Sequence, residues 1–268
     1  MTAKIVMASK SAFKKIIVHI PNTLTCISLM FGFYAAVLGI SGNYFGAMMA
    51  IFVAAVFDFC DGLAARLLKA YSAMGKELDS LADVISFGVA PGMMLFGFID
   101  QLLHRLAWND SSGCKLLLLT SFVIPVFSAL RLAKFNIDDR QKTSFLGLPV
   151  PAHAILWSSL ITVLASGTCT HCSLFPQLAE LLASIPAGIM LIGLSVLAVA
   201  TSFLLVSEIP MFSLKMSSFA WKANKLPYIL IASAILLICL FGLPGITATI
   251  LLYLLLSITW AGASCNSQ

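Results

Sequence analysis

The sequence predicts an all-α integral membrane protein with about eight transmembrane helices. Its composition, its long uncharged stretches and the distribution of its basic residues lead to this fold class. Of its 268 residues, 60% are hydrophobic and 10% are charged, and the mean hydropathy is +1.01. Soluble domains carry about 25% charged residues, so this chain lacks the charge to cover a soluble surface. The composition excludes a cytoplasmic globular enzyme, a nucleic-acid binder with a basic face and a disordered chain.

Stretches without Asp, Glu, Lys or Arg define the expected helices, because a membrane span needs about 20 mostly apolar residues. Residues 16–57 and 226–268 are each long enough for two spans, with breaks expected at 39–43 and 242–245. Four further spans are expected, one in each of the uncharged stretches 84–99, 116–130, 143–179 and 181–207. The first two stretches are shorter than a membrane span, so those helices should include flanking residues. No segment alternates in polarity over ~10 residues, which argues against a strand barrel.

The basic residues predict the orientation. With an even number of spans and a cytoplasmic N-terminus, all of the 16 Lys and Arg residues except Arg105 and Lys115 fall on the cytoplasmic side. Lys and Arg concentrate on that side of membrane proteins. We therefore expect both termini in the cytoplasm and a multi-pass protein of the cell membrane, the inner membrane if the source is a bacterium.

Four of the eleven acidic residues lie within a short segment at the cytoplasmic ends of two expected spans: Asp58, Asp61, Asp79 and Asp83. The first two are three positions apart and the last two are four apart, so each pair shares one helix face. Ionisable residues at membrane depth are costly and usually functional. Clustered carboxylates repel one another, and oxygen ligands favour Mg²⁺ or Mn²⁺, as a single ion or as a pair. The alternative is that these residues only mark where the helices leave the bilayer.

Small residues accompany the acids. Gly62, Ala65 and Gly75 could let a flat ligand, such as a nucleotide base, approach the helix backbone. Helix–helix packing is the alternative role for such residues. Elsewhere, Cys169 and Cys172 have the spacing of half a metal site, or of a chance pair in an outer loop.

Residues 58–83 read D-x2-D-G-x2-A-R-x8-G-x3-D-x3-D, which resembles the signature of the CDP-alcohol phosphatidyltransferase family. Residues 79–91, 131–136 and 145–151 resemble the branch of this family that makes phosphatidylserine, and Pro21-Asn22-x2-Thr25 also fits. The resemblance covers roughly residues 20–155. It implies one transmembrane catalytic domain over 1–268, with a motif-bearing core at 20–207 built on six family helices and an additional helix pair at 226–263.

The resemblance implies an enzyme of phospholipid biosynthesis that transfers the phosphatidyl group of CDP-diacylglycerol to the hydroxyl of L-serine and releases CMP. Asp58, Asp61 and Asp79 would ligate two Mg²⁺ or Mn²⁺ ions. Asp83 would be a further ligand and the general base. The nucleotide contacts would be Asn22, Thr25, Gly62, Ala65, Arg66 and Gly75. The family also implies a homodimer with its active site on the cytoplasmic face, among membrane lipid and with no nucleic-acid partner.

A cation near the metal site would be needed to bind the serine carboxylate. Arg131 ends an expected span on the cytoplasmic side and offers two parallel donors, and Lys134 and Asn136 follow it. Interfacial anchoring is the alternative role for the two basic residues. Two other functions stay open: the same chemistry with glycerol phosphate or inositol phosphate as acceptor, and a cation transporter. Carboxylates at one membrane face rather than at the midplane argue against the transporter.

Overall fold

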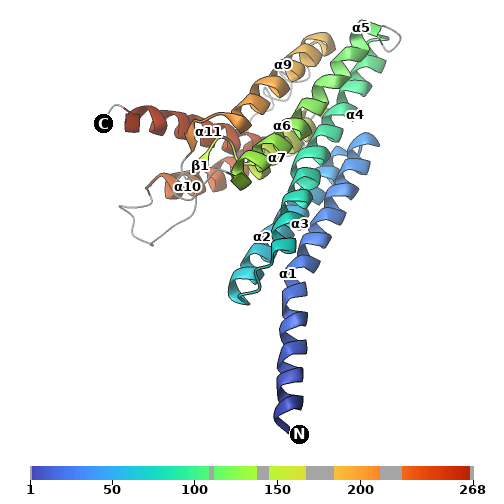
Figure 1. Cartoon of the computed structure of the whole chain (residues 1–268). Helices are drawn as coiled ribbons and strands as arrows, with labels where there is room; N and C mark the ends of the chain where they lie inside the picture. Colours follow the sequence, from blue (N-terminus) through green and yellow to red (C-terminus); the bar gives the residue numbers. More distant parts are fainter. Residues whose placement is uncertain (1, 109–111, 138–144, 167–183, 212–224, 266–268) are drawn as a thin grey trace.

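The computed structural model describes residues 2–108, 112–137, 145–166, 184–211 and 225–265 (Figure 1). Within these residues the protein consists of helices and one pair of two-residue strands. Six helical segments have the length and apolar composition to cross a membrane: His19–Ile40, Tyr44–Leu67, Ala73–Arg105, Leu116–Ile137, Ala187–Val206 and Leu243–Trp260. This confirms an all-α, multi-pass membrane protein. Two further apolar helices, Val150–Ala165 and Lys225–Phe241, are shorter, so the count of eight spans and the cytoplasmic termini stay predictions.

Both breaks expected inside the long uncharged stretches are present. Helix α1 (Thr2–Ile40) ends before Gly42, whose φ of 84° lies in the left-handed region that favours glycine. Asn43 then caps α2 (Tyr44–Leu67), accepting a hydrogen bond of 3.0 Å from the Gly46 amide. Helices α10 (Lys225–Phe241) and α11 (Leu243–Cys265) meet in the same way at Gly242, whose φ is 64°.

The third span begins earlier than the hydropathy suggests. Helix α3 (Ala73–Asp83), the π-helical segment η1 (Val84–Val89) and α4 (Ala90–Arg105) follow one another without a break. The first part of this continuous helix, α3, is polar, and the second part is apolar. The uncharged stretch at 84–99 therefore marks only the apolar part. The π-helical segment begins directly after Asp83, and such segments occur often at functional sites.

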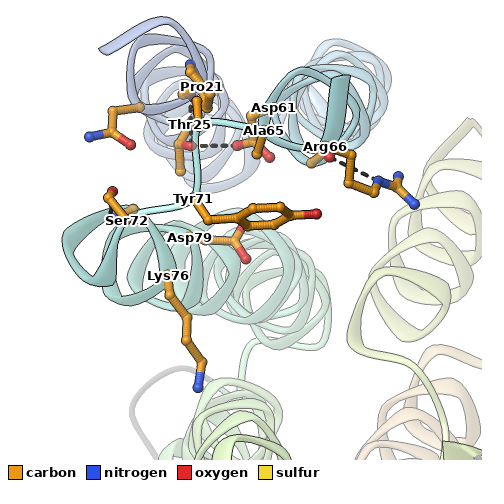
Figure 2. A pocket seen from close by; sticks show the side chains of 13 residues that line it. Pro21, Thr25, Asp61, Ala65, Arg66, Tyr71, Ser72, Lys76 and Asp79 are labelled. Atoms are coloured by element: carbon orange, nitrogen blue, oxygen red, sulfur yellow. Dashed lines mark hydrogen bonds between the residues drawn. The ribbon is translucent and has the colours of Figure 1, made fainter. Parts of the chain in front are cut away.

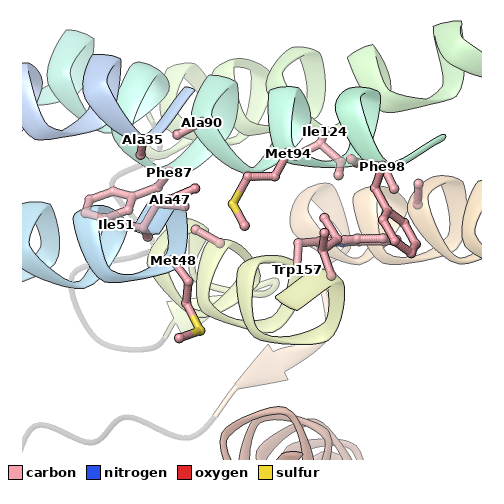
Figure 3. Close-up of a cluster of buried hydrophobic side chains, with 14 of the residues drawn as sticks. Ala35, Ala47, Met48, Ile51, Phe87, Ala90, Met94, Phe98, Ile124 and Trp157 are labelled. Carbon is pink, nitrogen blue, oxygen red and sulfur yellow. The ribbon is translucent and has the colours of Figure 1, made fainter. Parts of the chain in front are cut away.

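The core lies where α1, α2, η1, α4 and α7 (Val150–Ser166) pack together. Phe87 of η1 and Trp157 of α7 are fully buried, together with Ile51 of α2 and Met94 of α4 (Figure 3). Small residues allow the close approach of the helices: a Cβ on Gly97 would lie 2.5 Å from the carbonyl oxygen of Gly39. Helix α1 also contacts both α2 and α3.

The second half of the chain packs beside this core. After α5 (Ser112–Lys115) and η2 (Leu116–Phe122), helix α6 (Val123–Ile137) contacts η1 and α9 (Ala187–Val206). Strand β1 (Phe145–Leu146) pairs antiparallel with β2 (Pro210–Met211). Helix α11 packs against α7 and β2, so the C-terminal helix pair contacts the core through α11 (Figure 1).

Candidate active site

Three carboxylates from two helices converge at one point. Asp58 and Asp61 lie on α2, and Asp79 lies on α3. One oxygen of each lies within 4.8 Å of the other two. The short link at 68–72 turns the chain back, so the two acidic faces that the spacing predicts do meet. Asp83, one turn after Asp79, is close enough to Asp58 for their carboxyl groups to interact.

The donor set fits a hard divalent cation. Carboxylate oxygens are the ligands that Mg²⁺ and Mn²⁺ prefer, and the cluster contains no His or Cys in the part of the chain that the structure describes. Three anionic groups this close together repel one another, and a bound cation would remove that repulsion. The residues present therefore fit the metal site that the sequence predicts.

Thr25 of α1 completes the acidic cluster from a third helix. Its Oγ1 donates a hydrogen bond of 2.5 Å to Oδ2 of Asp61. Both side chains are buried. A hydrogen bond to a ligating carboxylate orients that carboxylate. Thr25 therefore holds Asp61 in place as well as lining the neighbouring cavity.

A cavity of about 280 Å³ opens beside Asp61 and Asp79, between α1, α2, α3 and the link at 68–72 (Figure 2). All six nucleotide contacts expected from the sequence line it: Asn22, Thr25, Gly62, Ala65, Arg66 and Gly75. The structure brings them together from three helices, next to the acidic cluster.

The two glycines of the cavity differ. A Cβ on Gly62 would meet no atom within 4 Å, so the space above it is open to a ligand. A Cβ on Gly75 would lie 2.8 Å from Asn22 Oδ1 and 2.9 Å from Ser72 Oγ. Gly75 is thus needed for the close approach of α3 to α1, in addition to lining the cavity.

The basic residues of the cavity do not point at the acids. Arg66 is exposed, and its Nε donates a hydrogen bond of 3.0 Å to the carbonyl oxygen of Gly62. The Lys76 side chain extends away from Asp79 (Figure 2). Both lie at the rim, where they could contact a bound anion.

Several lining residues escaped the sequence analysis: Pro21, Ala70, Tyr71, Ser72 and Lys76. Ala70, Tyr71 and Ser72 fall in the eight-residue spacer between Arg66 and Gly75, where the pattern fixes no residue type. Lys76 precedes Asp79 by three positions, so the helical repeat could have placed it on the same face.

The three residues expected to bind the serine carboxylate lie in different surroundings. Arg131 of α6 is buried, with an exposed fraction of 7%, and its charge interacts with that of Asp83. Its Nε has no hydrogen-bond partner among the described residues, and its guanidinium lies 5.5 Å from the centre of the Phe135 ring. The other two candidates have partners elsewhere.

Lys134 and Asn136 connect α6 to neighbouring segments. Lys134 Nζ lies 3.4 Å from Glu208 Oε1 and 3.4 Å from the carbonyl oxygen of Val206. Asn136 Nδ2 donates a hydrogen bond of 3.0 Å to Ser80 Oγ. Of the three, Arg131 is the one whose charge interacts with an acid next to the cluster, Asp83. Cys169 and Cys172 lie outside the described residues.

This fold and this site define a multi-pass membrane protein with a carboxylate cluster suited to a divalent cation. The chain belongs to the CDP-alcohol phosphatidyltransferase family, whose family model matches residues 18–183. The resemblance found in the signature at 58–83 is thereby confirmed. Members of this family are generally metal-dependent, in agreement with the acidic cluster.

Several curated relatives carry the name CDP-diacylglycerol--serine O-phosphatidyltransferase. The protein of Bacillus subtilis is 35% identical over 134 residues, which cover 48% of this chain and 70% of that protein. The protein of Helicobacter pylori is 33% identical over 138 residues, 51% of this chain and 54% of that protein. The protein of Methanocaldococcus jannaschii is 34% identical over 140 residues, 52% of this chain and 59% of that protein. The match thus spans little more than half the length of the latter two.

Proposed function

We propose that this chain is a phosphatidylserine-forming enzyme, which transfers the phosphatidyl group of CDP-diacylglycerol to the hydroxyl of L-serine and releases CMP. The observation that carries the proposal is the cluster of Asp58, Asp61 and Asp79 beside a cavity in which every expected nucleotide contact gathers. The names of the relatives supply the acceptor and the lipid donor.

The residues of the cluster divide the work. Asp58, Asp61 and Asp79 would hold two Mg²⁺ or Mn²⁺ ions, with Asp83 as a further ligand. A bound divalent cation would neutralise charge on the pyrophosphate and on the leaving CMP. Thr25 keeps Asp61 oriented through its hydrogen bond.

The transfer itself needs a base and a positioned alcohol. In the proposed step, the serine hydroxyl oxygen forms a bond to the phosphorus on the lipid side of the pyrophosphate. The bond from that phosphorus to the bridging oxygen of CMP breaks, and the hydroxyl proton passes to Asp83. The carboxyl group of Asp83 interacts with that of Asp58 and with the charge of Arg131. Arg131 would bind the serine carboxylate and so hold the amino acid near Asp83.

The position of the cavity agrees with access of the substrates from the cytoplasm. The cavity lies at the start of the His19–Ile40 span and at the end of α2, which the positive-inside distribution assigns to that side. We therefore propose a cytoplasmic active site in the cell membrane, and a homodimer as the assembly, the latter on family resemblance alone.

The decisive experiment offers the purified protein CDP-diacylglycerol with serine, inositol phosphate, glycerol phosphate or water in parallel, with Mn²⁺ present. Phosphatidylserine and an equal amount of CMP should form only with serine. A different phospholipid would identify the other acceptor and refute serine. Formation of no CMP in any of the four reactions would favour a cation transporter over a transferase.

A further inference from the structure

Tyr71 differs from every other residue that lines the cavity. It is the one aromatic side chain among the thirteen lining residues that the structure describes. It lies in the link at 68–72, within the spacer of the sequence pattern. No residue type is fixed there, so the signature says nothing about its role.

The backbone on both sides of Tyr71 is held in place. On the N-terminal side, the Ala70 amide donates a hydrogen bond of 3.0 Å to the carbonyl oxygen of Ala65, and Ala70 is buried. On the C-terminal side, Ser72 caps α3, accepting a hydrogen bond of 2.9 Å from the Gly75 amide. Since both neighbours are anchored, the link presents Tyr71 from a fixed position.

The ring of Tyr71, in contrast, is free. Its exposed fraction is 72%, and no aromatic ring among the described residues stacks on it. Figure 2 shows the ring lying across the cavity, between Ala65 of α2 and Asp79 of α3. Because the backbone is anchored, only the two side-chain torsions of the tyrosine need to become ordered when a flat ligand covers the ring.

We propose that the Tyr71 ring is the stacking platform for the nucleobase of the CDP-linked substrate. The inference rests on the proposed function, which puts a nucleotide in this cavity. The phosphates would lie toward Asp61 and Asp79, and the base would cover the ring. Stacking on an aromatic side chain is tolerant of base identity, because every base has a π-face. Tyr71 would thus position the nucleotide, while the lining backbone and Asn22 would contact the edge of the base.

Binding of two ligands by the full-length protein in detergent, with Mn²⁺ present, tests this role. CDP carries both the base and the phosphates, whereas pyrophosphate carries only the phosphates. In Tyr71→Ala, the dissociation constant for CDP should rise by roughly 5- to 150-fold, the range that loss of one base stack produces. The constant for pyrophosphate should stay within about two-fold, because stacking acts on the base alone. Tyr71→Phe, which keeps the ring, should bind CDP about as tightly as the parent protein.

Met74 provides a matched control. It lies three residues further on, is 70% exposed and does not line the cavity. Met74→Ala should leave CDP binding unchanged. If Tyr71→Ala binds CDP as tightly as Met74→Ala does, the ring serves only as an anchor at the membrane surface, and the inference is wrong. Equal weakening of CDP and pyrophosphate would also overturn it, because the ring would then act on the phosphates or the fold.

Failure of the proposed function would look different. In that case the unaltered protein itself would bind no CDP while still binding Mn²⁺. With CDP binding established for the unaltered protein, the Tyr71 variants test the stacking role alone.

Discussion

Thr25 on α1 and Asp61 on α2 are joined by a hydrogen bond of 2.5 Å from the threonine Oγ1 to the carboxylate Oδ2. This bond connects the first helix of the protein to the acidic cluster. It fixes the position of a carboxylate that lies within 4.8 Å of those of Asp58 and Asp79. The Pro21-Asn22-x2-Thr25 segment therefore contributes to the geometry of the cluster as well as to the cavity wall.

The first prediction concerns this bond. Thr25→Val keeps the shape of the side chain and removes the donor, so Asp61 loses its orienting partner. Loss of such a partner typically weakens metal binding by about 10- to 100-fold. The concentration of Mn²⁺ that gives half-maximal CMP release should rise by that factor, and Thr25→Ser should restore it. An unchanged Mn²⁺ dependence in Thr25→Val would show that the bond has no role in metal binding.

Much of the fold could be predicted because hydropathy and turn residues are local signals. Gly42 and Gly242 end their helices within the predicted breaks. The continuous helix Ala73–Arg105 could not be predicted in full, because its first part is polar and only packing against α1 keeps it in line with the span. The strand pair β1–β2 joins segments far apart in the sequence, so no local pattern signals it.

In the site, as in the fold, the local arrangement could be predicted and the contacts between distant segments could not. Helical spacing placed Asp58 and Asp61 on one face and Asp79 on another, and a short link brings the faces together. Lys134 contacts Glu208, which lies more than seventy positions away in the sequence. Tyr71 lies in the link between two helices, where side-chain direction depends on turn geometry rather than on a helical repeat. These contacts required the tertiary structure.

The second prediction concerns the metal. A chelator should abolish CMP release, and Mg²⁺ or Mn²⁺ should restore it, because the clustered carboxylates need a hard cation. Stability offers a readout independent of activity: a ligand that binds only the folded protein raises its melting temperature. Mn²⁺ should therefore raise the melting temperature in detergent. Sodium chloride at equal ionic strength is the control, and an equal rise with sodium would rule out a specific site.

The third prediction uses the contrast between two glycines. Gly75→Ala should destabilise the protein by about 1 kcal/mol, because the new Cβ would displace the Asn22 side chain and the Ser72 hydroxyl that caps α3. Gly62→Ala has open space and should keep or slightly raise stability, since alanine favours the helix. It should nevertheless weaken CDP binding, because the added methyl group enters the cavity. Thermal melting and CDP titration of both variants separate the two effects, and full CDP affinity in Gly62→Ala would mean that the ligand does not approach this part of α2.

The fourth prediction separates Asp83 from the other acids. Asp58→Asn, Asp61→Asn and Asp79→Asn should weaken Mn²⁺ and CDP binding, because each removes an anionic ligand from the three-residue cluster. Asp83→Asn should lower kcat while keeping more of the affinity for CDP-diacylglycerol, since a base acts after the substrates have bound. Steady-state kinetics together with CDP titration of the four variants checks this division. Equal loss of CDP affinity in all four would leave no separate role for Asp83.

The last prediction concerns the acceptor. Arg131 is buried, its Nε has no partner among the described residues, and its charge interacts with that of Asp83. Burying a cation is costly unless something pairs with it. Asp83 supplies part of that pairing, and the serine carboxylate would add a second anionic partner when it binds. A hydrogen bond to a charged group contributes about 1.5–3 kcal/mol, so Arg131→Ala should raise the KM for serine by roughly 10- to 150-fold.

The KM for CDP-diacylglycerol should change much less, because Arg131 does not line the cavity. Arg131→Lys should recover only part of the serine affinity, since lysine cannot offer two parallel donors to a carboxylate. Arg105, an exposed arginine at the end of α4, supplies the control, and Arg105→Ala should leave both KM values unchanged. If Arg131→Ala instead loses CDP-lipid affinity and keeps its serine KM, Arg131 serves the phosphates or the fold. The serine carboxylate would then have to bind elsewhere, and Asn136 at the α6–α3 contact would be the next residue to vary.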